Sequence, residues 1–221
     1  MTNSVEIQVH NKIKKAKPGT IFFVESFLFV GNAKAVNKAL ERLVDKSEIA
    51  RVATGMYARL KKSKLLGEIT PSVEEIATAI AKRDKARIVP TGSYALNALG
   101  LSTQVPLKAV YLTDGAARKI TVGKRTIQFK KTTPKNLSAN GSISKLVIQA
   151  LKTIGKDKIN PEEERKILEL LRKEKPEHLE HDIVLAPEWI RKIMRKAQKN
   201  ARELNQNMER HQTRRLEGYL S

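Results

Sequence analysis

An apolar stripe at helical spacing, followed directly by a hairpin pattern, constrains the fold of this chain more than any other feature. Val36, Leu40 and Leu43 recur at the spacing of a helix that buries one face. Residues 49–59 then form two short β-prone runs joined by Thr54-Gly55, and a glycine at this joint favours a tight hairpin. The pattern predicts a helix and a hairpin that belong to one small domain.

The residues before this helix predict the rest of that domain. Glycine tolerates positive φ and Asn caps helix N-termini well, so we expect Gly31 to form a turn and Asn32 to cap the helix. Phe22, Phe27 and Phe29 cluster here, and we expect them to form the core rather than to stack on bases. The earlier elements are expected to be a helix from Val5 to Ala16, a strand over 20–23 able to pair with the hairpin, and a helix over 25–29.

Helix, turn, helix and basic hairpin in this order are typical of a winged helix-turn-helix, whose second helix enters the major groove of DNA. The alternatives are an RNA-binding module and a winged helix that contacts only protein. For DNA binding, the sequence predicts a set of polar and basic side chains on the helix, on the hairpin and just after it. They are Lys34, Asn37, Lys38 and Arg42, then Arg51, Thr54 and Arg59, and finally Lys61 and Lys62.

Charge favours nucleic acid as the partner. The formal net charge is +20 with a pI near 10.2, and the basic surplus lies in the first two thirds of the sequence. There is no cysteine and the four histidines are scattered, so no metal site is predicted. No apolar run approaches the ~20 residues that span a bilayer, and the N-terminus lacks a secretory h-region. We therefore expect a cytoplasmic protein without a membrane partner.

The whole chain is expected to be α+β, with three parts. Residues 1–66 form the winged helix, 67–180 a small mixed α/β domain and 181–221 a helical tail, and residues 61–70 are expected to form the linker. In the tail, Ile190, Met194 and Ala197 begin a four-three spacing like a coiled-coil seam. Three alternatives are open: a homodimer through residues 188–211, packing on the chain's own core, and an unstructured end.

One pattern raises the question of an enzyme. Thr91-Gly92-Ser93 precedes a predicted helix and Asp114 follows a predicted strand, an arrangement that resembles nucleotidyltransferases. Binding the metal in such a site takes at least two acids together, and Asp114 has no acid two residues away. We therefore predict no catalytic residue, no cofactor and no enzymatic activity, and interpret Gly92-Ser93 as the start of a helix.

The sequence contains an ordered set of segments: PGTIFFVESF, AVNKALERLV, IARVATGMYAR, PSVEEIATAIAKRDKARIVPTGSYALNALGLSTQVPLKAVYLTDG and GKRTIQFKKTTPKNL. On these segments rests a resemblance, over about residues 5–175, to the AbiEi-like antitoxins of bacterial type IV toxin–antitoxin systems. It implies an N-terminal winged helix that represses its own promoter by binding inverted repeats in double-stranded DNA. It also implies a second domain that counters a nucleotidyltransferase-like toxin without forming a stable complex. The tail from about residue 180 lies outside the resemblance.

Overall fold

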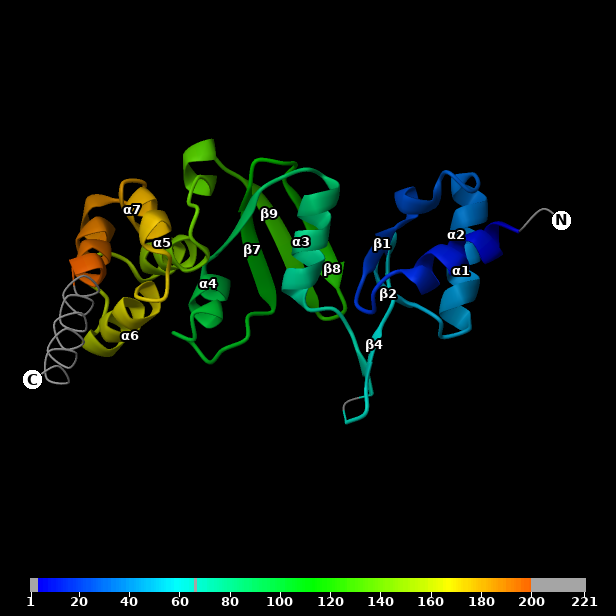
Figure 1. Ribbon diagram of the computed structural model, residues 1–221, viewed down its shortest axis with the longest axis horizontal. Coiled ribbons are helices and arrows are strands. Elements are labelled where there is room, and N and C mark those ends of the chain that lie inside the picture. The colour runs from blue at the N-terminus through cyan, green and yellow to red at the C-terminus, as the bar shows by residue number, and fades with distance from the viewer. Residues whose placement is uncertain (1–3, 66, 200–221) are drawn as a thin grey trace, which may run out of the picture. The chain divides into compact units, whose positions relative to one another are not determined.

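The computed structural model describes residues 4–65 and 67–199 and divides the chain into two compact units. Unit 1 holds residues 1–86 and 119–127, and unit 2 holds residues 87–118 and 128–221 (Figure 1). The described residues form helices and three small β-sheets. The predicted α+β class is confirmed.

Unit 1 begins with two helices packed together and a small sheet. The sheet has the strand order β1-β3-β2, both pairs are antiparallel, and Phe22 lies opposite Tyr57. The expected pairing of the first strand with the hairpin is therefore confirmed. The elements are α1 (Val5–Lys15), β1 (Ile21–Phe23), the 3-10 helix η1 (Val24–Phe27), α2 (Ala33–Asp45), β2 (Ala50–Ala53) and β3 (Met56–Ala58).

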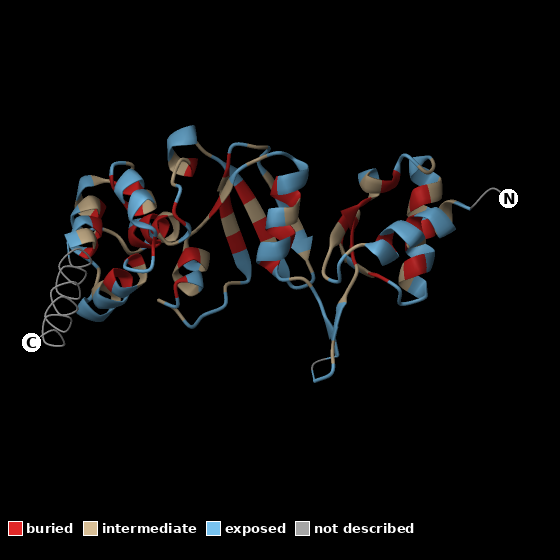
Figure 2. Cartoon of the chain, viewed as in Figure 1, coloured by how far each residue is buried: buried red, intermediate tan, exposed pale blue. Residues whose placement is uncertain are grey.

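The core under α2 contains two of the three expected phenylalanines. Phe22 and Phe27 are buried with ring centroids 5.6 Å apart, and Leu40 packs in the same cluster. Buried and exposed bands alternate along α2 (Figure 2), as an amphipathic helix requires. The prediction for Phe29 is wrong: its side chain is 69% exposed, because η1 ends at Phe27 and Phe29 lies in the turn that follows.

Asn32 caps α2 as expected, but Gly31 is needed for a different reason. The side chain of Asn32 accepts a hydrogen bond of 2.9 Å from the backbone N–H of Ala35. Gly31 does not have positive φ. Instead, a Cβ at this position would lie 3.0 Å from a methyl group of Val5, so the glycine permits close approach of α1.

The expected linker over residues 61–70 is in fact a two-stranded hairpin. Strands β4 (Lys61–Ser63) and β5 (Gly67–Ile69) pair antiparallel, with Lys61 opposite Ile69. Most described residues of this hairpin are exposed, and it extends away from the rest of unit 1 (Figure 1). With no buried face, the hairpin leaves no alternating pattern in the sequence.

A four-stranded sheet and a helix follow the hairpin. The sheet has the order β6-β7-β9-β8, and β6 pairs antiparallel with β7. Ser72 caps α3 through a capping box with Glu75. The elements are α3 (Val73–Arg83), β6 (Ile88–Thr91), α4 (Ser93–Ala98), β7 (Lys108–Thr113), β8 (Arg118–Val122), β9 (Arg125–Lys131) and the 3-10 helix η2 (Pro134–Leu137).

Unit 2 ends in a helical bundle whose core takes in the start of the predicted tail. Residues 188–199 are helical, and Ile190, Met194 and Ala197 are fully buried with Leu151 and Leu171. These seam residues therefore pack on their own chain, while the remaining predicted seam, residues 200–211, lies outside the described residues. The other helices are α5 (Ser142–Ile154), α6 (Pro161–Leu171) and α7 (Pro176–Ile183).

Two buried carboxylates hold the N-terminus of α5. Asp182 accepts hydrogen bonds of 2.8 Å from the backbone N–H groups of Asn140 and Gly141, and a further one from the Ser144 hydroxyl. Glu174 accepts from the N–H of Ile143 at 2.7 Å. Negative charge is favourable at a helix N-terminus, so these acids fix the start of α5 against α7 and the residues just before it.

The observed units differ from the expected boundaries at 66 and 180. α3 belongs to unit 1, where Lys61 pairs with Glu75 and the Arg83 guanidinium lies 4.3 Å from the Phe23 ring centroid. Residues 188–199 share the core of unit 2 rather than forming a separate tail. Within the described residues, no helix combines the length and the apolar character needed to cross a bilayer.

Candidate nucleic-acid interface

Four of the predicted DNA-binding residues lie on α2. Lys34, Lys38 and Arg42 are exposed and follow one another at intervals of four, with Asn37 half-buried beside them. They lie away from the buried stripe that faces α1 and the core. Neither Lys34 nor Lys38 forms an ion pair or side-chain hydrogen bond with any described residue, so both ammonium groups are available to a partner.

Arg42 is not available in the same way, because it is paired with Glu6 on α1. Its guanidinium lies 3.1 Å from the Glu6 carboxylate, and Lys46 lies 2.5 Å from the other oxygen of that carboxylate. Hydrogen bonds from Lys46 and then from Arg42 hold the pKa of Glu6 below its ordinary value. Glu6 therefore stays ionised at neutral pH and neutralises part of the basic charge at this end of α2.

The hairpin β2–β3 carries two further predicted residues. Its tip is Thr54-Gly55, as expected, and Gly55 has φ of 68°, a conformation that suits glycine. Thr54 and Arg51 are exposed, and Arg51 forms no ion pair or side-chain hydrogen bond with any described residue. We call Lys34, Asn37, Lys38, Arg42, Arg51 and Thr54 the α2–hairpin surface.

Arg59 lies at the end of the same hairpin but faces its own chain. Its guanidinium donates a hydrogen bond of 2.7 Å to the backbone carbonyl of Lys14 and another to that of Ala16. These carbonyls end α1 and have no partner within the helix. Sequence alternation alone placed Arg59 in solvent; the structure shows that it is half-buried and closes the C-terminus of α1.

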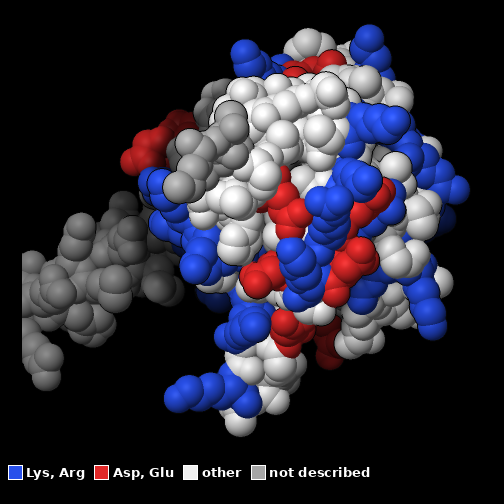
Figure 3. Space-filling model, turned by 90° about the vertical axis from the view of Figure 1, so that its right-hand side faces the viewer, with Lys and Arg blue, Asp and Glu red and all other residues white. Residues whose placement is uncertain are grey.

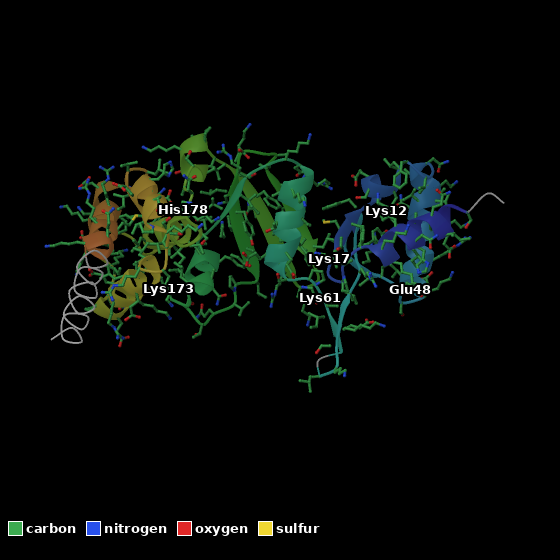
Figure 4. All side chains as sticks on the ribbon, viewed as in Figure 1. Lys12, Lys17, Glu48, Lys61, Lys173 and His178 are labelled. Atoms are coloured by element: carbon green, nitrogen blue, oxygen red, sulfur yellow. The ribbon has the colours of Figure 1, made fainter. Side chains whose placement is uncertain are left out.

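Lys61 and Lys62 lie on β4, and each faces a carboxylate. Lys61, at the base of the β4–β5 hairpin (Figure 4), is 3.1 Å from Glu75, and Lys62 is 3.9 Å from Glu68. The pKa of Glu75 is lowered by its hydrogen bond from the backbone of Ser72 and by Lys61. Both lysines are therefore paired with acids outside the α2–hairpin surface, Lys61 with α3 and Lys62 across its own hairpin.

Two basic residues that sequence reasoning did not single out lie near Arg51. Lys124 and Arg125, at the β8–β9 turn, line a pocket of about 490 Å³ together with Arg51 and the start of α3. All of these residues belong to unit 1. The closeness of this turn to Arg51 depends on a contact between distant segments, which no local pattern indicates.

The face of unit 1 that carries α1 and α2 is of mixed charge. Figure 3 shows Lys and Arg side chains there with Asp and Glu side chains between them. Glu41 and Asp45 are exposed on α2 itself, and Glu48 follows it (Figure 4). The basic side chains thus form separate positions along α2 and the hairpin rather than one unbroken positive surface.

The segment between η1 and α2 exposes apolar side chains. Leu28 is 46% and Phe29 69% exposed. The ammonium of Lys12 lies 4.3 Å from the centroid of the Phe29 ring and donates a hydrogen bond of 2.6 Å to the carbonyl of Ser26. An exposed aromatic ring beside the start of α2 could not be told from a core residue by sequence spacing.

The residues that raised the question of an enzyme are engaged in local structure. The carboxylate of Asp114 accepts from the backbone N–H of Arg87 at 2.7 Å and from its guanidinium at 2.8 Å. These bonds, the side-chain one first, lower the pKa of Asp114. Gly92 is the N-cap of α4, in agreement with a helix that starts at Gly92-Ser93. Among the described residues, no group of three or more His, Asp or Glu side chains is placed to hold a metal ion.

Comparison with known proteins places the chain in a family. A family of unknown function, DUF6088, matches residues 8–179, which includes most of α1, the α2–hairpin surface, the four-stranded sheet and the helices up to α7. No curated protein matches the chain. Because the match covers most of the sequence, the chain belongs to the DUF6088 family.

Proposed function

We propose that this protein binds double-stranded DNA through the α2–hairpin surface and acts as a transcriptional repressor of its own promoter. The observation that carries the proposal is the presentation of Lys34 and Lys38 on the exposed side of α2, with Arg51 on the neighbouring hairpin. Cationic side chains on a helix that fits the major groove, beside a hairpin that can reach the backbone, are what duplex recognition requires.

The order of elements supports a winged helix. Unit 1 runs α1, β1, η1, α2, β2 and β3, with the sheet order β1-β3-β2. In such a domain the helix directly before the hairpin is the recognition helix, which here is α2. Under this proposal Thr54-Gly55 forms the tip of the wing.

The acids on this face shape the expected binding. Glu41 and Asp45 lie on α2 among the basic residues, and Glu6 pairs with Arg42. These carboxylates repel DNA phosphates, so we expect only modest affinity for a duplex of unrelated sequence. Affinity should be higher for a sequence in which base contacts add to the phosphate contacts. Asn37 is the side chain on α2 best suited to such a base contact, because its amide can pair with an adenine edge.

The antitoxin part of the proposal rests on the resemblance described above. Under it, the protein represses a bacterial toxin–antitoxin operon from the cytoplasm, and its second domain counters a nucleotidyltransferase-like toxin without a stable complex. It would perform no enzymatic step of its own and need no cofactor.

A protein-interaction role is the second candidate, and Leu28 and Phe29 favour it. Both side chains are large, apolar and exposed between η1 and α2. Exposed apolar side chains next to each other are more typical of a protein contact than of a phosphate contact. RNA binding is a third alternative, which the proposed experiment separates by competition.

The test is a gel shift of the full chain with the duplex that lies upstream of its own reading frame. Lys34→Glu combined with Lys38→Glu should weaken binding by about a hundredfold or more, because two phosphate contacts become repulsions. Lys156→Glu combined with Lys173→Glu makes the same change of net charge in unit 2 and should leave most of the affinity.

Three results would overturn the proposal. They are equal losses in the two charge-reversal variants, no shift of the upstream duplex by the wild-type protein, and displacement of that duplex by structured RNA at lower concentration than by unlabelled duplex. The third result would favour the RNA-binding alternative.

A further inference from the structure

A small cavity in unit 2 is lined by basic and amide side chains from two elements. Lys135 and Asn136 come from η2, while Lys145, Gln149 and Lys152 come from α5. The three α5 residues are four and three apart and so share one face of the helix. The cavity measures about 10 Å³, which is room for one water-sized atom. The residues that line it include no carboxylate.

The positive charges of Lys135 and Lys152 repel each other. Burial, and then the charge of Lys135, lower the pKa of Lys152. The Lys152 ammonium donates a hydrogen bond of 3.3 Å to the side-chain oxygen of Asn136, and no acid among the described residues pairs with it. Both lysines are exposed, but two like charges close together still raise each other's free energy, and a bound anion would relieve this.

The Gln149 side chain is a separate observation that points to a ligand. Gln149 is only 4% exposed, yet within the described part of the chain only its backbone carbonyl is engaged, by the Thr153 hydroxyl at 2.8 Å. Neither atom of its amide is among the fully buried polar atoms without a partner, so the amide is accessible from the cavity. Its NH₂ group can donate to an oxygen atom held in the cavity that it lines.

We propose that this cavity is an oxyanion site that binds a phosphoryl group. One phosphoryl oxygen would occupy the cavity and accept from the Gln149 amide, while Lys135, Lys145 and Lys152 would neutralise the charge of the group at the surface. Ammonium groups bind phosphate as point charges and amide N–H groups orient it. The site lies outside the α2–hairpin surface and does not depend on the function proposed for that surface.

The phosphoryl group can come from two sources, free phosphate or the backbone of a nucleic acid, and the experiment has one arm for each. In the first arm, inorganic phosphate is titrated into the full chain at constant ionic strength, with NMR detection of the Gln149 side-chain NH₂ signals. In the second arm, a duplex replaces phosphate. Each arm compares the wild type with Lys135→Ala plus Lys152→Ala and with the control Lys173→Ala plus Lys192→Ala.

The site predicts a saturable shift of the Gln149 signals, and a loss of affinity of about tenfold or more in the Lys135/Lys152 variant but not in the control. A response in the phosphate arm identifies free phosphate or a phosphate monoester as the ligand. A response in the duplex arm alone identifies a backbone phosphodiester. No shift in either arm, which would mean that the cavity holds water only, or equal losses in both variants, would overturn the site.

Discussion

Glu6 controls how much positive charge at the C-terminal end of α2 can meet a polyanion. Its carboxylate pairs with both Arg42 and Lys46, and its pKa is lowered by them. The three side chains come from helices that pack together. A change at Glu6 therefore alters the charge offered by α2 without altering α2 itself.

Replacing Glu6 with Gln should strengthen duplex binding several-fold and steepen its salt dependence by about one phosphate equivalent. The reason is that Arg42 and Lys46 lose their shared anion. Affinity at several salt concentrations measures both quantities. Glu177→Gln, an exposed acid on α7, removes the same charge in unit 2 and should change the slope little; an equal effect would mean that only net charge matters.

Arg51, on β2, and Arg59, directly after β3, offer a matched comparison. Arg59→Met removes the hydrogen bonds to the Lys14 and Ala16 carbonyls and should lower the free energy of unfolding by about 1.5–3 kcal/mol. Arg51→Met should change stability by less than about 0.5 kcal/mol, because Arg51 is exposed. Urea unfolding measures both.

The same pair should behave in the opposite way towards DNA. Loss of Arg51 should reduce the salt slope by about 1, while loss of Arg59 should leave the slope unchanged. If Arg59→Met left the protein stable but weakened duplex binding, Arg59 would be a DNA-contacting residue of the hairpin, contrary to this prediction.

Individual residues were predictable from the sequence only where local spacing decides their environment. Lys34, Lys38 and Arg51 lie in solvent as their spacing requires. Arg59 finds its partners on α1, far away in the sequence. Phe29 has the composition of a core residue, but the early end of η1 leaves it exposed. Such outcomes depend on tertiary contacts, which periodicity does not contain.

At the scale of elements, the N-terminus of α5 depends on acids from α7 and the residues just before it. Asp182 is fully buried and its carboxylate oxygens together accept from two backbone N–H groups and a hydroxyl. Asp182→Asn should destabilise the protein by about 2–3 kcal/mol, because an amide has one acceptor oxygen and leaves a buried N–H unpaired. Glu180→Gln, exposed on the same helix, should be near neutral. Chemical unfolding of both variants measures the difference, and equal stabilities would contradict the cap.

The start of β6 and the end of β7 are joined by Arg87 and Asp114. The pKa of Asp114 is lower in the folded protein, so its contribution to stability is complete above the unfolded pKa of about 4 and is lost as pH falls through the folded value. Asp114→Asn should therefore lower the unfolding midpoint at neutral pH and flatten its fall below about pH 4. Thermal unfolding across this pH range measures both effects. An unchanged acid limb would mean that the pair contributes nothing.

Most elements were predictable because they carry a strong period or a cap. The stripe of α2, the capping residue Asn32 and the hairpin turn at Thr54-Gly55 all predicted what the structure shows. The β4–β5 hairpin was not predictable, since a hairpin exposed on both faces has no alternation. α7 was not predicted either, and the division into units depends on packing between segments that are far apart in sequence.

For the whole molecule, the net charge of +20 makes some attraction to any polyanion unavoidable. Localised binding requires in addition that the contact lies on α2 and the β2–β3 hairpin. Salt dependence distinguishes diffuse attraction from localised contact, because each ammonium group in contact with phosphate adds about one to the slope of log affinity against log salt.

The most direct test is this slope for the wild type, for Lys34→Ala plus Lys38→Ala, and for the control Lys156→Ala plus Lys173→Ala, all with one duplex. Contact through α2 predicts that the slope falls by about 2 in the Lys34/Lys38 variant and stays at the wild-type value in the control. Equal slopes in all three proteins would show that the duplex does not lie against α2 and would contradict the account.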